Sequence, residues 1–274
     1  MNIFGFHFER ERQPQYTNKV GLALSGGGAR GFAHTGVIRA MNEVGLKADI
    51  VAGVSAGSVV AAMYAAGIPT DEMVSMFDDL SFSDLAEWKV PRDGFFSLDP
   101  FAEFLRKNIP YRRIEDLPIK TLICATDFDS GRKTAFSAGP LAECIAASCS
   151  IPIVFKPRVI SGRRYVDGGV IANLPAWALR DKARFLVGVN CSPVSHTIAG
   201  DSIVQIALRS YELMAKNNAA HDMELCDMLI RTDDIAKYKV FDLKGIHRVA
   251  EEGYRQTMRF FADHGIHPRS ITIE

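Results

Sequence analysis

Short apolar runs alternate along the chain with longer segments in which apolar residues recur every three or four positions. The short runs are typical of buried strands, and the longer segments are typical of amphipathic helices. Strands are expected over residues 19–25, 49–54, 121–128, 133–136, 158–160, 164–166 and 184–190. Strands interleaved with helices in this order predict an α/β fold with a mostly parallel sheet.

Helices are expected over residues 31–44, 56–66, 202–220 and 246–264, and a further helix is expected to begin at Asp99. Gly45 ends the first of these helices and Gly67 ends the second, because glycine readily adopts the left-handed conformation found at helix C-termini. Asp99 and Pro100 are suited to the N-cap and the first helical position of the further helix.

The composition is that of an ordinary globular protein without net charge. The 274 residues include 32 basic and 32 acidic side chains. Because these charges cancel, no net field favours nucleic acid, which argues against a nucleic-acid-binding protein. A chain of this length often forms one α/β domain. We expect a single domain over residues 19–274, preceded by an N-terminal extension over residues 1–18.

No segment has the length of a membrane span or the pattern of a secretory signal. The longest apolar run, Val59–Ile68, is well short of the roughly 20 residues that cross a bilayer. The apolar N-terminus, Met1–Phe8, is too short for a signal sequence. We expect a cytoplasmic protein. Its Ile3–Phe8 segment is a candidate for weak, reversible contact with a membrane surface, and packing or disorder of that segment is the alternative.

The cysteines indicate neither a disulfide framework nor a metal site. There are five of them, and Cys144 and Cys149 lie close together. No nearby histidine or second cysteine pair completes a zinc site, so we expect buried free thiols. The chain also has no H-E-x-x-H sequence and no carboxylate-rich calcium loop. We therefore expect neither a metal nor a cofactor.

The sharpest local signal is the pentapeptide Gly53-Val54-Ser55-Ala56-Gly57, which matches G-x-S-x-G between an expected strand and an expected helix. A serine on such a turn is held in a strained conformation with its hydroxyl pointing out of the sheet. The flanking glycines are needed because a Cβ at either position would clash across the turn. The alternative is an ordinary strand-to-helix turn of small residues.

A glycine-rich loop, Gly26-Gly27-Gly28-Ala29-Arg30-Gly31, joins the first expected strand to its helix. It matches the dinucleotide fingerprint G-x-G-x-x-G, for which Asp49 is at roughly the right distance but begins the second strand instead of ending it. No Gly-Lys-Ser/Thr follows, so it is not a P-loop. The remaining interpretation is a nest of N–H groups that holds an oxyanion, as an acyl-transfer nucleophile requires.

Asp167-Gly168-Gly169 follows the strand expected over residues 164–166. An Asp-Gly pair is commonly a simple turn. The carboxylate is also a candidate general base for the serine, with the two glycines permitting close approach.

These blocks, in this order, resemble the patatin-like phospholipase family. Its G-G-G-x-R-G motif matches Gly26–Gly31, its G-x-S-x-G motif matches Gly53–Gly57, and its D-G-G/A motif matches Asp167–Gly169. A fourth block, A-S-x-x-x-P, matches Ala147, Ser148 and Pro152. The resemblance covers about residues 19–180, is nearest to the small bacterial branch of the family, and leaves the region after about residue 185 without a matched motif.

The resemblance implies a three-layer α/β/α sandwich and a Ser–Asp dyad that cleaves fatty-acyl esters of lipids or lysophospholipids without a cofactor. By position it makes Ser55 the nucleophile and Asp167 its base. It places the oxyanion hole at the N–H groups of Gly27 and Gly28. Arg30 falls on the family's arginine, with a role in steering a phosphate or stabilising the hole.

Two alternatives stay open. The first is an α/β-hydrolase esterase with a Ser-Asp-His triad. Its base would be one of His196, His221, His247, His264 and His267. His34, near the glycine loop, is expected to serve only in packing. The second alternative is a nucleotide-binding module that uses the glycine loop without catalysis. The sequence leaves the oligomeric state, the head group and the acyl chain of a substrate open.

Overall fold

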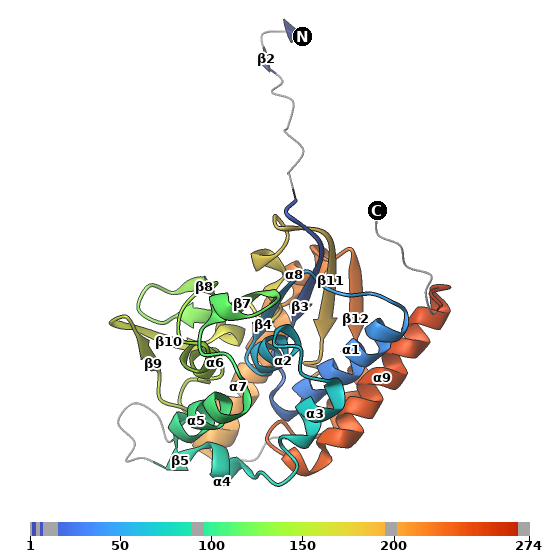
Figure 1. Ribbon diagram of the computed structural model, residues 1–274. Coiled ribbons are helices and arrows are strands. Elements are labelled where there is room, and N and C mark those ends of the chain that lie inside the picture. Colours follow the sequence, from blue (N-terminus) through green and yellow to red (C-terminus); the bar gives the residue numbers. More distant parts are fainter. Residues whose placement is uncertain (1, 4–5, 8–15, 89–95, 195–201, 268–274) are drawn as a thin grey trace.

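The structure is a computed structural model of the chain, and it describes residues 2–3, 6–7, 16–88, 96–194 and 202–267 (Figure 1). Its main sheet has the strand order β12-β11-β3-β4-β7-β10-β9, with β8 paired to β7. These strands are β3 (Asn18–Leu24), β4 (Ile50–Val54), β7 (Lys120–Asp127), β8 (Arg132–Phe136), β9 (Arg158–Ile160), β10 (Arg163–Asp167), β11 (Ala183–Asn190) and β12 (Met228–Arg231). The run from β12 to β7 is parallel, and β8, β9 and β10 pair antiparallel. The mostly parallel sheet confirms the predicted fold class.

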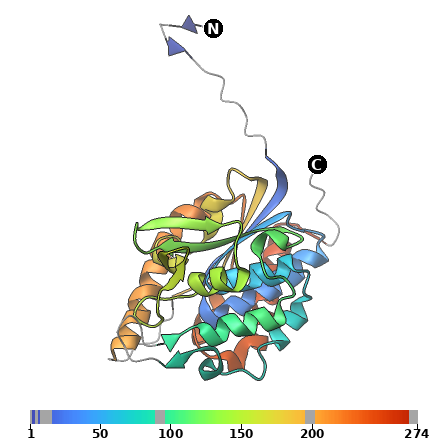
Figure 2. The same cartoon turned by 60° about the vertical axis from the view of Figure 1, so that its left-hand side comes forward.

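Helices cover both faces of this sheet, as Figures 1 and 2 show from two directions. The helices are α1 (Ala33–Glu43), α2 (Ala56–Ala65), α3 (Thr70–Ser75), α4 (Phe82–Leu85), α5 (Asp99–Asn108), α6 (Leu141–Ser148), α7 (Ile203–Asn218), α8 (Ala220–Glu224) and α9 (Ile246–Asp263). Two small two-stranded sheets, β1 (Asn2–Ile3) with β2 (Phe6–His7) and β5 (Glu87–Trp88) with β6 (Phe96–Ser97), and several short 3₁₀ helices complete the described elements.

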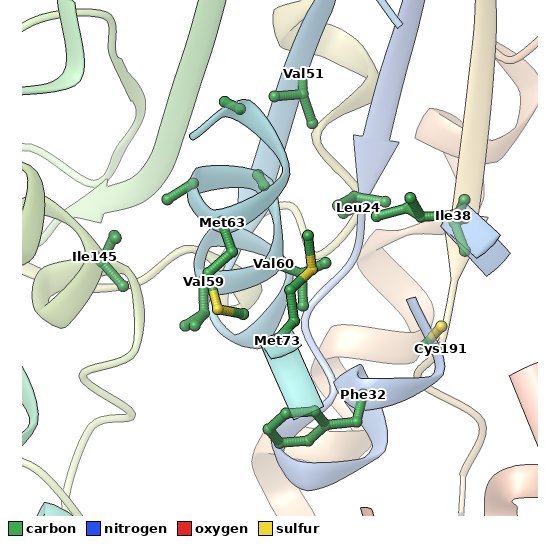
Figure 3. Close-up of a cluster of buried hydrophobic side chains, with 14 of the residues drawn as sticks. Leu24, Phe32, Ile38, Val51, Val59, Val60, Met63, Met73, Ile145 and Cys191 are labelled. Atoms are coloured by element: carbon green, nitrogen blue, oxygen red, sulfur yellow. The ribbon is translucent and has the colours of Figure 1, made fainter. Parts of the chain in front are cut away.

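The central strands are apolar on both faces because each face is covered. Leu24 and Val51 pack into the larger core cluster with residues of α1, α2, α3 and α6 (Figure 3). Ala23 and Ala52, their neighbours along the strands, belong to a second cluster on the other face, with residues 174–179 and Ala219. Successive strand residues point to opposite faces, so continuous apolar runs follow from a sheet between two layers. The predicted three-layer α/β/α sandwich is confirmed.

The predicted strands are present with boundaries within one residue. The strand β12, the helices α3, α4, α6 and α8 and the four two-residue strands were not predicted. The N-cap of α5 was predicted wrongly by one position. Leu98 is the N-cap and Asp99 is the first helical residue. The Asp99 N–H donates to the Ser97 hydroxyl at 3.1 Å. The side chain that binds the first free N–H group of the helix is therefore that of Ser97 and not that of Asp99.

Two further expectations bear on membranes. In the described part of the chain, no helix is long and apolar enough to cross a bilayer. The Ile3–Phe8 segment, proposed to contact a membrane surface, lies half outside the described residues: only its short strand pieces in β1 and β2 are placed.

Helices α1 and α9 cross with their backbones in direct contact. A Cβ at Gly253 of α9 would lie 2.3 Å from the Ala33 carbonyl oxygen, and a Cβ at Gly36 of α1 would lie 1.9 Å from the Ala250 carbonyl oxygen. Glycine is therefore required at both positions, because the backbone atom that a Cβ would meet cannot move aside as a side chain can.

Gly253→Ala is expected to lower the free energy of unfolding by about 1–3 kcal/mol, the usual cost of overpacking. Urea unfolding followed by circular dichroism measures this. Gly245→Ala is the control, since a Cβ there meets Tyr238 at an ordinary 3.6 Å. Equal stabilities of the two variants would show that the helices do not cross as described.

Candidate active site

Two strands that run in opposite directions end on neighbouring residues of β7. Val54, the last residue of β4, pairs with Cys124, and Asp167, the last residue of β10, pairs with Ala125. The two strands flank β7 on opposite sides, β4 parallel and β10 antiparallel to it, so their C-terminal ends come level with each other across β7. The structure therefore brings Ser55 and Asp167 together, although 112 positions separate them in the sequence.

Ser55 occupies the tight turn between β4 and α2. Its backbone lies at φ 52° and ψ −126°, a conformation that residues with a side chain rarely adopt. Neither flanking glycine has room for a side chain: a Cβ would lie 2.2 Å from the Gly57 carbonyl oxygen at Gly53, and 2.3 Å from the Leu24 carbonyl oxygen at Gly57. A side chain on either side of the serine would therefore clash, as expected from the sequence.

The turn is held in place by a hydrogen bond to Ser148, the last residue of α6. The Ser55 N–H donates to the Ser148 hydroxyl at 2.8 Å, and that hydroxyl donates to the Cys124 carbonyl oxygen at 2.6 Å. Ser148 thus links the serine turn to β7, and it satisfies a backbone donor that would otherwise be buried without a partner. This gives a structural reason for the A-S-x-x-x-P block.

Asp167 is fully buried, and its two carboxylate oxygens have different surroundings. Oδ1 accepts hydrogen bonds from the Gly169 N–H and from the Tyr211 hydroxyl, each at 2.8 Å. Oδ2 is buried and has no hydrogen-bond partner among the described residues. Burial raises the pKa of Asp167 to about 6. The nearby Ser55 hydroxyl, which makes no hydrogen bond to Oδ2 in the structure, opposes that rise, as do the Gly169 N–H and the Tyr211 hydroxyl.

The glycine loop leads from β3 into the short 3₁₀ helix Gly28–Phe32, next to Ser55. Its Gly26 N–H donates to the Asn173 carbonyl oxygen, and its Ala29 N–H donates to the Val240 carbonyl oxygen. Between them, the N–H groups of Gly27 and Gly28 have no acceptor in the described ranges. Gly28 has φ 58°, and a Cβ there would lie 2.4 Å from the Val240 carbonyl oxygen. Both residues line a pocket that also contains Ser55.

Arg30 is almost fully buried and binds other parts of the chain. Its Nε donates to the Tyr238 carbonyl oxygen at 2.7 Å, and Nη1 donates to the Pro193 carbonyl oxygen at 2.9 Å. It also pairs with Glu212 at 3.4 Å. The guanidinium braces the glycine loop against segments far along the chain, so the phosphate-steering role implied for Arg30 finds no support in this geometry.

A second, apolar pocket opens beside Ser55. It follows one face of α2 through Val59, Val60 and Met63, which recur at helical spacing after the serine. Its remaining apolar lining comes from other elements: Ala29, Phe32, Phe77, Leu85, Ala86, Leu98, Phe101, Ile151, Phe155, Val240, Phe241 and Leu243. The pocket suits a hydrocarbon chain attached to a group that Ser55 could attack.

None of the histidines in the described part of the chain lines either pocket at Ser55. His34 is fully buried, its Nε2 lies 2.8 Å from the Ser25 carbonyl oxygen, and burial lowers its pKa to about 4. His247 contacts Asp78, and His264 Nδ1 lies 2.8 Å from the Phe260 carbonyl oxygen. His196 lies outside the described residues. The described histidines give the triad alternative no base.

Asp49 does not occupy the position that a dinucleotide site requires. Its Oδ2 accepts the backbone N–H groups of Lys19 and Val20 at 3.0 and 2.9 Å. It therefore lies at the start of β3, at the opposite edge of the sheet from Ser55. In the described ranges, no group of three or more His, Cys, Asp or Glu side chains is placed to hold a metal ion.

The sequence analysis missed Tyr211 on α7 and Asn173 after the Asp167 turn. Asn173 contributes the carbonyl oxygen that holds Gly26, and its side-chain Nδ2 is buried without a partner among the described residues. The only signal in the sequence was the amphipathic pattern of residues 202–220, which does not indicate which side chain reaches the site.

Residues 22–180, more than half of the chain, match the family model described as patatin-like phospholipase. The chain belongs to the patatin-like phospholipase family. With this fold and serine turn, the resemblance seen in the motifs is confirmed.

Proteins of similar sequence carry names related to this family. An uncharacterized NTE family protein of Mycobacterium tuberculosis, Rv1063c, is 37% identical over 160 residues, which are 57% of this chain and 44% of that protein. Lysophospholipase NTE1 of Pyricularia oryzae is 32% identical over 57% of this chain and 11% of its own length. The chain thus spans less than half the length of these relatives.

One solved structure extends the likeness beyond the matched residues. VipD of Legionella pneumophila superimposes with a TM-score of 0.59 at 15% identity, covering 94% of this chain and 72% of VipD. The two proteins share a fold.

Asp167→Asn is expected to stabilise the protein at pH 8. The folded-state pKa of about 6 lies above the ordinary value of 3.8, so stability from this group is complete below pH 3.8 and is lost as the pH rises through 6. The difference between these two pKa values lowers the free energy of unfolding by about 3 kcal/mol at pH 8. Urea unfolding at pH 8 and pH 4 measures the difference, which should nearly vanish at pH 4.

Asp127→Asn is the matched control on the adjacent strand. Hydrogen bonds, chiefly from the Ser130 N–H, lower the pKa of Asp127, so its loss should destabilise the protein at pH 8. Stability changes of the same sign in both variants would contradict the electrostatics described for Asp167.

Proposed function

We propose that this protein is a serine acyl hydrolase that cleaves fatty-acyl esters of lipids, with Ser55 as nucleophile and Asp167 as general base. One observation carries the proposal: a serine in a strained turn, which lines an apolar pocket, meets a buried carboxylate whose Oδ2 has no partner among the described residues. A carboxylate with one saturated and one unsatisfied oxygen is arranged to accept a proton.

The first half-reaction forms an acyl-enzyme. Asp167 Oδ2 takes the proton from Ser55 as Oγ attacks the ester carbonyl carbon. A pKa of about 6 leaves Asp167 ionised at neutral pH yet more basic than an exposed aspartate. When the tetrahedral intermediate collapses, the same proton passes from Asp167 to the departing alcohol.

The second half-reaction releases the fatty acid. Water attacks the acyl carbon, Asp167 takes a proton from that water, and the proton returns to Ser55 Oγ as the acyl bond breaks. In both halves the negative carbonyl oxygen is held by the N–H groups of Gly27 and Gly28, each worth about 3–4 kcal/mol by analogy with other oxyanion holes.

The pocket supports a lipid as the acyl donor. Met63 lies eight residues after Ser55 along α2, a helical rise of about 12 Å, so the lining reaches well beyond a short acyl group. Contact with a membrane surface is proposed as transient, because the substrate resides there. The name lysophospholipase borne by one relative favours one-chain phospholipids among the possible substrates.

Ser55→Ala is expected to abolish ester hydrolysis and labelling by a fluorophosphonate while leaving the fold unchanged, because only one oxygen is lost. Activity is measured on lysophospholipids, two-chain phospholipids and short-chain p-nitrophenyl esters, which also ranks the substrates. Ser210→Ala, an exposed serine on α7, is the control and should behave as wild type. Hydrolysis or labelling by Ser55→Ala at near wild-type rates would refute the proposal.

A further inference from the structure

Helix α7 lies outside the residues matched to the family, yet one of its side chains reaches the proposed base. The Tyr211 hydroxyl donates to Asp167 Oδ1 at 2.8 Å. The next residue of α7, Glu212, pairs with Arg30 of the glycine loop, and Asn218 is the last residue of the helix. Asn218 donates to the Gly169 carbonyl oxygen and accepts the Asn173 N–H. The helix therefore holds the Asp167 turn at more than one point.

We propose that Tyr211 is a positioning residue for the acyl-transfer reaction: its hydroxyl saturates Oδ1 of Asp167, so that Oδ2 is the oxygen that exchanges protons with Ser55. This inference rests on the proposed function. With the Gly169 N–H, the hydroxyl gives Oδ1 two donors, while Oδ2 has none among the described residues. Two donors on one oxygen fix the rotation of the carboxylate.

The fit around the hydroxyl is close enough to require glycine. A Cβ at Gly169 would lie 2.0 Å from the Tyr211 hydroxyl oxygen. The second glycine of Asp-Gly-Gly thus has a physical reason in this chain: it leaves space for a tyrosine from a distant helix to reach the carboxylate.

The hydroxyl also favours the ionised form of the base. A donor to a carboxylate lowers the pKa of that carboxylate, here against the opposing effect of burial. Tyr211 itself remains a donor, since burial and the neighbouring Asp167 charge raise its pKa well above 10. Its removal is expected to raise the pKa of Asp167.

Few other ionisable groups face Asp167. Burial raises the pKa of the Cys124 thiol on β7 and of the Cys149 thiol after α6, so neither titrates near neutral pH. Among the described residues, Glu212 is the carboxylate that lines the pocket shared by Ser55 and Tyr211, and it pairs with Arg30 and with Arg209 at 3.2 Å. A test must therefore distinguish an effect of Asp167 on the pH dependence from an effect of Glu212.

The experiment compares the pH dependence of kcat/KM for wild type and Tyr211→Phe, with ¹³C NMR titration of carboxyl-labelled aspartate in both. The Asp167 resonance is assigned as the one missing from Asp167→Asn. We expect both the acid limb and the resonance midpoint to move up by about one pH unit in Tyr211→Phe, since a hydrogen bond to an ionised group is lost. On the acid limb kcat/KM then falls about tenfold, with a smaller loss above pH 8.

Two controls and a second variant sharpen the result. Tyr254→Phe removes another tyrosine hydroxyl that donates to a carboxylate, Glu43 of α1 at 3.0 Å, outside the site, and should leave the limb unchanged. Glu212→Gln should keep the acid limb. Gly169→Ala pushes the Tyr211 hydroxyl away without removing it and should shift the limb in the same direction as Tyr211→Phe.

The outcomes are distinct. A folded Tyr211→Phe whose acid limb and resonance midpoint match wild type would overturn the inference, as would an acid limb that disappears in Glu212→Gln. If wild type hydrolyses no ester while the resonance still shifts in Tyr211→Phe, the hydrogen bond stands and the proposed function fails.

Discussion

The close packing of the segments that follow β4 and β10, on either side of β7, is the constraint on which the site depends. The two strands end opposite Cys124 and Ala125, and a Cβ at Gly168, the residue after β10, would lie 2.8 Å from the Cys124 carbonyl oxygen. That crowding accounts for the left-handed backbone of Ser55 and for glycines on both sides of it. It also places a serine and a carboxylate from distant parts of the sequence at the same edge of the sheet, next to the start of α2.

The same crowding removes water from Asp167, and this has two consequences. Burial raises the pKa of the carboxylate, which makes it a better base, and an ionised carboxylate with a bare Oδ2 lowers stability at neutral pH. Residues outside the serine turn limit this cost, because Tyr211 and the Gly169 N–H bind the other oxygen. Proteins commonly accept such local instability where function requires it.

Much of the fold could be predicted because its signals are local. Apolar runs and glycine stops located all but one strand of the main sheet and the long helices closely, and the motif blocks identified residues that gather at Ser55. The exceptions depend on contacts between distant segments. The partners of Arg30 lie more than 160 positions away, and Tyr211 reaches Asp167 from a helix whose sequence shows only amphipathicity. The cap of α5 was misassigned because the Asp99 N–H is bound by the Ser97 hydroxyl, a contact that an Asp-Pro pair does not reveal.

The central claim is that Ser55 carries the acyl group during turnover. Protein quenched in acid during hydrolysis of a slow long-chain ester, digested and analysed by tandem mass spectrometry, tests it most directly. The account predicts that the mass of the acyl group is found on Ser55 and that it accumulates within one turnover. An acyl group on another residue, or turnover with no acylated peptide at any time, would contradict the account.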